Sequence, residues 1–230
     1  MGTRHLVAVQ MNGEYKLAQY GQWDGYPEGQ GVHVLDFLKN GDIEAFKRNL
    51  AKTYQPTDEE QAKLWLEVGV DIVETKGMVP YSKSDEFAKK FPSLHRNTGA
   101  GILQLVADSE EEKIPVDLAI EFAADSLFCE WAYVIDFDID ALEVYKGFNK
   151  EPVPADSRFA QFAPDDHPAL EDKYYQVALA HSWKLSSLPS QEEFLQAFAE
   201  PEENIVSEDE ATPAAPNDGE GEADKPVWAS

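Results

Sequence analysis

The sequence lacks the cysteines that a disulfide needs and the long apolar runs that a membrane anchor needs. Its single cysteine, Cys129, allows neither an internal disulfide nor a cluster of thiolate metal ligands. No apolar run approaches the ~20 residues that a membrane-spanning helix needs, and the first residues do not form the apolar block of a signal peptide. We therefore expect a cytoplasmic protein without a membrane anchor, in which Cys129 is a buried, small, apolar side chain.

Positive charge is also scarce. The chain has 19 lysines and arginines against 44 aspartates and glutamates, and its net charge is −25. A surface of this sign repels nucleic acid and anionic membranes, so we expect neither as a partner. Two interpretations of the acidic surface stay open: it is simply solvated, or it binds a basic protein partner.

The motifs of common enzymes and metal sites are missing from the sequence. None of the five histidines has the His-x-x-x-His spacing, and there is no phosphate-binding loop, dinucleotide fingerprint or Gly-x-Ser-x-Gly elbow. Asp136, Asp138 and Asp140 are spaced like the first ligands of an EF-hand, but Ala141 and Gly147 stand where glycine and glutamate are required. We therefore expect no metal and no cofactor, and interpret these aspartates as part of a hairpin turn.

Alternating hydrophobicity predicts two β-hairpins. The first turns at Asn12-Gly13, the dipeptide that most strongly favours a two-residue type I′ turn, and the second turns at residues 138–140. A further strand is expected near the end of the folded region, after a long loop at 149–173. The expected strands cover residues 6–11, 14–20, 131–137, 142–145 and 175–185.

Capping signals predict several helices. Thr57 and Ser190 each begin a capping box, and Asp42 is a good cap for another helix. The expected helices cover residues 32–39, 43–52, 58–68, 84–91, 98–106, 115–124 and 190–199. Two hairpins with several helices indicate an α+β fold, in which an antiparallel sheet carries helices on one side.

The last part of the chain differs in composition from the rest. Residues 200–230 contain ten acidic residues and one basic residue, Lys225, and almost no aliphatic side chains. Such a segment cannot bury enough apolar surface to order itself. We therefore predict a single α+β domain at residues 2–199 and a disordered acidic tail at residues 200–230.

The first hairpin predicts which residues meet at the N-terminus. A two-residue turn pairs residues whose numbers sum to 25, which places Arg4 opposite Gly21 and Thr3 opposite Gln22. A bulge would change this register. The polar N-terminus is thus expected to lie beside the glycine-rich loop at residues 22–31, whose glycines let the backbone approach a ligand.

The residue types around this loop suit ligand chemistry. Arg4 offers a planar fork for a carboxylate or phosphate, and Asp24 is either its partner or a general base. The candidate catalytic residues are Asp24, Arg4 and Thr3, and the candidate ligand-binding residues here are Gln22, Trp23 and Tyr26. An alternative stays open: an Arg4–Asp24 ion pair that only fixes the loop to the sheet, with Trp23 and Tyr26 as core anchors.

A second basic group precedes a predicted helix. His95 and Arg96 stand just before Asn97 and Thr98, either of which can cap the helix that follows. With the free N–H groups of the helix start they would form an anion pocket. The alternative is an ordinary capped helix with Arg96 in solvent.

The run Thr3-Arg4-His5-Leu6, followed by Tyr20-Gly-Gln-Trp-Asp-Gly-Tyr-Pro-Glu-Gly-Gln-Gly31, resembles a family of uncharacterised proteins from bacteria, bacteriophages and filamentous fungi. The match covers about the first forty residues, and the family implies no particular activity. It is compatible with a phage- or defence-associated role.

A looser resemblance is to N-terminal-nucleophile amidohydrolases, which also begin with a strand, an antiparallel hairpin and early arginine and aspartate residues. That chemistry needs cysteine, serine or threonine at the mature N-terminus. Gly2 has no nucleophile, so Thr3 would serve only after a further cleavage. From the residues and both resemblances we expect a site for a small anionic ligand, and the second resemblance implies a hydrolase-like enzyme. The alternative is an acidic interaction module for a basic partner.

Overall fold

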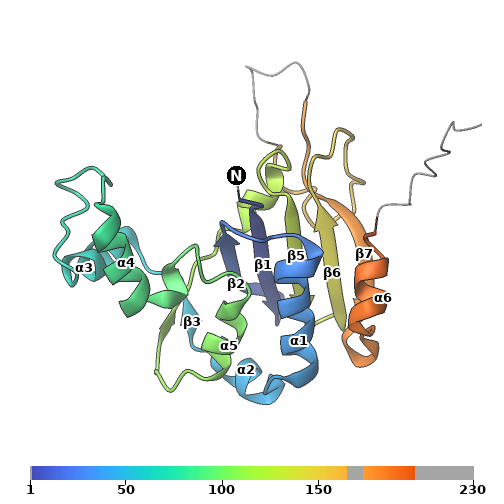
Figure 1. The fold of residues 1–230 in the computed structure, drawn as a ribbon, viewed down its shortest axis with the longest axis horizontal. Helices are drawn as coiled ribbons and strands as arrows, with labels where there is room; N and C mark the ends of the chain where they lie inside the picture. Colours follow the sequence, from blue (N-terminus) through green and yellow to red (C-terminus); the bar gives the residue numbers. More distant parts are fainter. Residues whose placement is uncertain (1, 165–172, 200–230) are drawn as a thin grey trace, which may run out of the picture. The chain divides into compact units, whose positions relative to one another are not determined.

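The computed structural model describes residues 2–164 and 173–199, which belong to one compact unit. Its centre is a five-stranded sheet with the order β2-β1-β5-β6-β7 (Figure 1). The predicted tail at residues 200–230 lies outside the described residues, as does the part of the 149–173 loop at residues 165–172. The strands are β1 (His5–Met11), β2 (Glu14–Gly21), β5 (Trp131–Asp136), β6 (Ala141–Lys146) and β7 (Ala178–Lys184).

The sheet consists of the two predicted hairpins, β1–β2 and β5–β6, with β7 added at one edge. This arrangement confirms the α+β fold class, and most strand pairs are antiparallel. The two hairpins meet through a parallel pairing of β1 with β5, which the sequence did not predict. Parallel neighbours need a long crossover connection, and residues 22–130 provide it.

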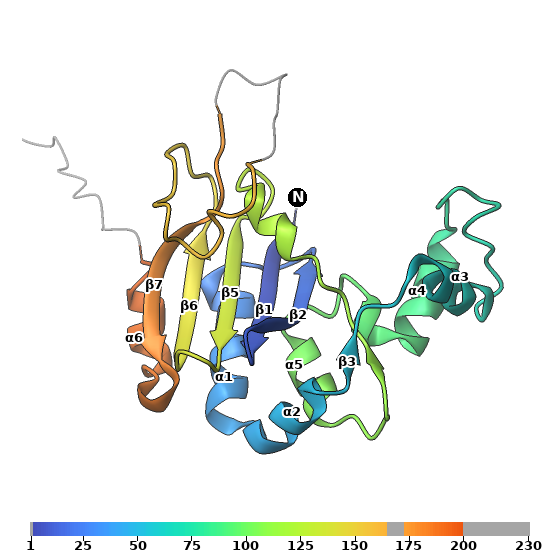
Figure 2. The same cartoon turned by 180° about the vertical axis from the view of Figure 1, so that it is seen from behind.

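Helices cover one face of the sheet. Figure 1 shows α1 in front of the strands, and Figure 2, from behind, shows the strands in front of α1. The apolar side chains of α1, α2, α5 and α6 form a core with every second residue of β1, including Val7 and Val9. The α-helices are α1 (Val32–Asn40), α2 (Ile43–Leu50), α3 (Asp58–Leu66), α4 (Tyr81–Lys90), α5 (Gly101–Ala107) and α6 (Gln191–Gln196).

The other face of the sheet carries a second core. Leu6 and Ala8 of β1 point to this side and pack with Cys129, Tyr145 and Phe159. The short helix η3 (Ile120–Ala124) and the segment 147–162 cover it. Cys129 is fully buried, which confirms its expected role as an apolar side chain.

Local capping chemistry was predicted well at three helices. Both capping boxes are present, with Thr57 accepting from the N–H of Glu60 and Ser190 from that of Glu193. Asp42 accepts from the N–H of Ala45, as expected.

Three predicted helix starts were wrong. Helix α4 begins at Tyr81 after Pro80, so Ser84 lies inside it. Helix α5 begins at Gly101, and neither Asn97 nor Thr98 caps it. Pro115 belongs to β4 (Ile114–Pro115), which pairs with β3 (Thr53–Tyr54), because a distant partner strand outweighs the helical pattern.

A bulge in β2 also changes the predicted register. Met11 pairs with Glu14 as expected, but the pairing shifts between Gln10 and Val9, where Lys16 is the extra residue. His5 therefore lies opposite Gly21 rather than Tyr20. No described helix is both long and apolar enough to span a bilayer.

Candidate functional site

The loop that follows β2 folds back onto the N-terminus, as the sequence predicted. The N–H of Gly25 donates to the carbonyl of Thr3 at 2.9 Å, and the hydroxyl of Tyr133 donates to the carbonyl of Gly25 at 2.7 Å. Asp24 adopts a left-handed conformation with φ of 55°, and its carbonyl accepts from the N–H of Gln30 at 2.9 Å. The loop is thus held mainly through its backbone, which leaves several of its side chains available.

His5 fills the space under this loop. It is fully buried, and a Cβ atom added at Gly21 would overlap its imidazole ring, so only glycine fits opposite it. Neither ring nitrogen has a hydrogen-bond partner. Burial lowers the pKa of His5 to about 4, so the ring is neutral at physiological pH.

Arg4 and Asp24 do not form the ion pair that the sequence left open. Among the residues that the structure describes, no ion pair joins them. The guanidinium of Arg4 instead lies 4.3 Å from the ring centre of Phe128, and its Nε is buried without a partner. The carboxylate of Asp24 accepts from the hydroxyl of Tyr26 at 3.3 Å, and its charge raises the pKa of that tyrosine.

Arg4 instead shares its surroundings with Arg96. Burial raises the pKa of Tyr20, and the positive charges of Arg4 and Arg96 both oppose that shift. The N–H of Gln22 donates to the carbonyl of Arg96 at 3.1 Å, and the hydroxyl of Tyr20 donates to Oε1 of Gln22 at 2.6 Å. We call Arg4, Tyr20, Gln22 and Arg96 the Arg4–Arg96 site.

The other predicted ligand-binding residues flank this site. Trp23 is 49% exposed and Tyr26 40% exposed, so the interpretation of these two as core anchors was wrong. Trp23 donates through Nε1 to Oδ1 of Asn97 at 3.1 Å. His95 is half-buried, which lowers its pKa, and its Nδ1 accepts from the N–H of Asn97 at 3.3 Å.

The predicted helix start does not contribute to anion binding. Helix α5 begins five residues after Arg96, and the N–H of Ala100 already donates to Oε1 of Gln30 at 2.7 Å. The anion pocket expected from His95, Arg96 and free helix N–H groups is therefore not formed in that way.

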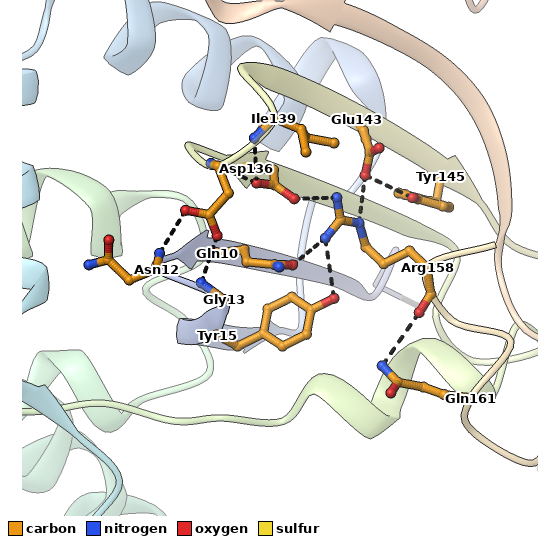
Figure 3. A network of polar contacts seen from close by, with 11 residues as sticks. Gln10, Asn12, Gly13, Tyr15, Asp136, Ile139, Glu143, Tyr145, Arg158 and Gln161 are labelled. Atoms are coloured by element: carbon orange, nitrogen blue, oxygen red, sulfur yellow. Dashed lines mark hydrogen bonds and ion pairs between the residues drawn. The ribbon is translucent and has the colours of Figure 1, made fainter. Parts of the chain in front are cut away.

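A second polar site, which the sequence did not predict, surrounds Arg158 (Figure 3). Its guanidinium donates to Asp136 and to Glu143 at 2.6 Å each, and also contacts Gln10 and the hydroxyl of Tyr15. Burial disfavours the charged form of Arg158, but the hydrogen bonds outweigh this effect and raise its pKa. Arg158 thus fixes the 149–162 segment to four strands of the sheet, β1, β2, β5 and β6.

The same network joins the two hairpin turns. Asp136 is 2% exposed, and its Oδ1 accepts from the N–H groups of Asp138 and Ile139. The carboxylate of Asp138 accepts from the N–H groups of Asn12 and Gly13 at 2.7 and 2.8 Å. Asp136 and Asp138 therefore bind arginine and backbone groups.

A cavity of about 1160 Å³ opens beside this network, and we call it the Arg158 cavity. It lies between the sheet and the 149–162 segment. Its walls include the strand residues Tyr15, Glu143 and Tyr145 and the segment residues Glu151 and Arg158. Burial raises the pKa of both tyrosines, so both keep their protons at neutral pH.

One feature of the sequence, polar residues on strand faces that point to the second core, indicates this cavity. Gln10, Asp136 and Glu143 are polar residues at positions of β1, β5 and β6 that point to the side of the second core. Buried polar groups on a sheet need partners, but nothing local points to Arg158 as the partner.

Comparison with known proteins identifies no relative. No protein-family model matches the chain, and neither the curated proteins nor the solved structures contain a match. Both resemblances noted in the sequence therefore stay predictions.

Proposed function

We propose that this protein binds a small anionic molecule at the Arg4–Arg96 site. The observation that supports the proposal is that Gln22 binds both the backbone of Arg96 and the hydroxyl of Tyr20, a group on which the charges of Arg4 and Arg96 both act. The chain has only four arginines, against 44 acidic residues. Within the described residues, neither Arg4 nor Arg96 belongs to an ion pair, whereas Arg158 forms two.

Two guanidinium groups near one another repel unless an anion lies between them. An unpartnered buried donor such as Nε of Arg4 costs about 1–3 kcal/mol, which a ligand oxygen would recover. Oε1 of Gln22 accepts from Tyr20, which orients the amide so that its Nε2 is a further donor. A carboxylate or phosphate matches this set of donors.

Thr3 and Asp24 adjoin the site through the hydrogen bond between Thr3 and Gly25. They stay the candidate catalytic residues if the ligand is hydrolysed, with Asp24 as the base. Trp23 and Tyr26 would form the rim of the site, since both are exposed beside it. A cytoplasmic location is part of the same proposal.

Isothermal titration calorimetry with phosphate and with succinate tests the anion site. We expect Arg4→Gln and Arg96→Gln each to weaken binding by roughly ten- to a hundredfold, because each removes a charge-assisted hydrogen bond. Arg48→Gln is the matched control, since Arg48 is exposed on α2. Equal weakening in all three variants, or no binding of either anion to the wild type, would contradict the proposal.

A second proposal, that the acidic surface binds a basic protein partner, is supported by the net charge of −25. Its test is capture of a basic protein whose binding weakens as salt rises from about 0.05 to 0.3 M. Binding that is insensitive to salt would contradict it.

A further inference from the structure

The Arg158 cavity is separate from the Arg4–Arg96 site. Gln10 at one end of β1 lines the cavity, whereas Arg4 precedes the other end of this strand. The side chains of Leu6 and Ala8 in the second core lie between the two. The volume of about 1160 Å³ is somewhat larger than the usual range of about 300–1,000 Å³ for small-molecule sites, so a ligand and ordered water both fit.

The charges that line the cavity are mostly negative. Arg158 is the one basic residue among its described lining residues, and Asp136 and Glu143 already balance its charge. Two further carboxylates, those of Glu151 and Asp156, belong to the 149–162 segment and are exposed. Glu14, also in the lining, pairs with Lys16. A concave surface with an excess of carboxylates concentrates cations.

The neutral lining groups favour an organic ligand. Tyr15, Val153 and Leu179 supply aromatic and apolar surface, and aromatic rings attract organic cations. The hydroxyl of Tyr145 donates to Glu143 at 2.9 Å, so it is already oriented. Among residues 2–164 and 173–199, no three potential metal ligands converge.

We propose that the Arg158 cavity binds a small organic cation that carries amino groups. Its amino groups would pair with Glu151 and Asp156 at the mouth of the cavity. Its carbon chain would lie against Tyr15 and Leu179. Arg158 would not contact the cation directly. It positions Glu143 and the 149–162 segment, and so keeps the cavity open.

Calorimetric titration with spermidine at about 150 mM salt tests this proposal. The variant Glu151→Gln/Asp156→Asn removes two lining charges outside the Arg158 network. We expect it to bind about tenfold more weakly, because each exposed ion pair contributes up to about 1 kcal/mol. The control Glu110→Gln/Glu111→Gln removes two exposed charges elsewhere and should bind within about twofold of the wild type.

Three results would overturn the proposal. One is equal weakening in the two double variants, which would mean diffuse attraction to an acidic surface. Another is the absence of saturable binding to the wild type. The third is a spermidine affinity that falls with Arg4→Gln, since Arg4 lies outside the cavity. Because that variant is also part of the anion titration, failure of one site can be told apart from failure of the other.

Discussion

Asp138 accepts hydrogen bonds from the backbone of Gly13, 125 residues earlier in the chain, and thereby joins the tips of the two hairpins. The N–H of Asn12 donates to the other oxygen of the same carboxylate. These bonds reinforce the parallel pairing of β1 with β5, because they lie at the end where both strands finish.

Replacing Asp138 should therefore destabilise the whole domain. We expect Asp138→Ala to lower the free energy of unfolding by about 1–2 kcal/mol, since two backbone N–H groups lose a charged acceptor but can bind water instead. Urea unfolding followed by fluorescence measures the change. Glu110→Gln, another exposed carboxylate, is the control and should stay within about 0.5 kcal/mol of the wild type. An equal midpoint in the two variants would mean that the turns are not coupled.

Replacing Arg158 should destabilise the domain more than replacing Asp138, because the loss of Arg158 leaves Asp136 buried without its partner. We expect Arg158→Met to cost about 3–5 kcal/mol at neutral pH. Urea unfolding at neutral pH measures the loss. A change of less than about 0.5 kcal/mol would show that Arg158 does not hold the buried carboxylate in place.

His5 should make the free energy of unfolding depend on pH between about 4 and 6.5. Its folded pKa is about 4 against 6.5 for the unfolded chain, so the unfolded state binds more protons between these values. The contribution of His5 is fully present above pH 6.5, and about 3 kcal/mol is lost as pH falls towards 4. His5→Leu should remove that part of the slope, although it also changes the packing under the loop. A slope unchanged in His5→Leu would refute the assignment.

Asp24 should contribute little to stability, in contrast to Asp136. Its carboxylate is exposed and does not pair with Arg4, and asparagine tolerates the left-handed conformation as well as aspartate does. We expect Asp24→Asn to shift the free energy of unfolding by less than about 0.5 kcal/mol. A loss of about 3–5 kcal/mol would instead indicate a buried ion pair at the loop.

Features that depend on neighbouring residues could be predicted from the sequence. The Asn12-Gly13 turn and the capping boxes at Thr57 and Ser190 use groups within four residues of one another, and the structure has all three. The contact between Thr3 and the glycine-rich loop followed from the same hairpin, even though the bulge at Lys16 changed its register.

Features that depend on distant partners could not be predicted. Nothing near Gln10 indicates that its strand pairs with β5, or that Arg158 binds its side chain from 148 residues away. Pro115 is in β4 because Thr53 and Tyr54 pair with it, which the helical pattern around it does not reveal. For the candidate site, the sequence singled out Arg4 and Arg96 and left open an ion pair of Arg4 with Asp24, whereas the guanidinium of Arg4 lies over Phe128.

The parallel pairing of β1 with β5 has a consequence for synthesis of the chain. The β1–β2 hairpin is complete after residue 21, but its inner neighbour ends only at Asp136, 115 residues later. At about 5–20 residues per second, ribosomes need on the order of 10 s to make that stretch. During that time Leu6 and Ala8, which are fully covered in the finished protein, lack the later residues that cover them, such as Cys129 and Phe159. The nascent hairpin therefore passes through a period in which chaperones can bind it and in which it can aggregate.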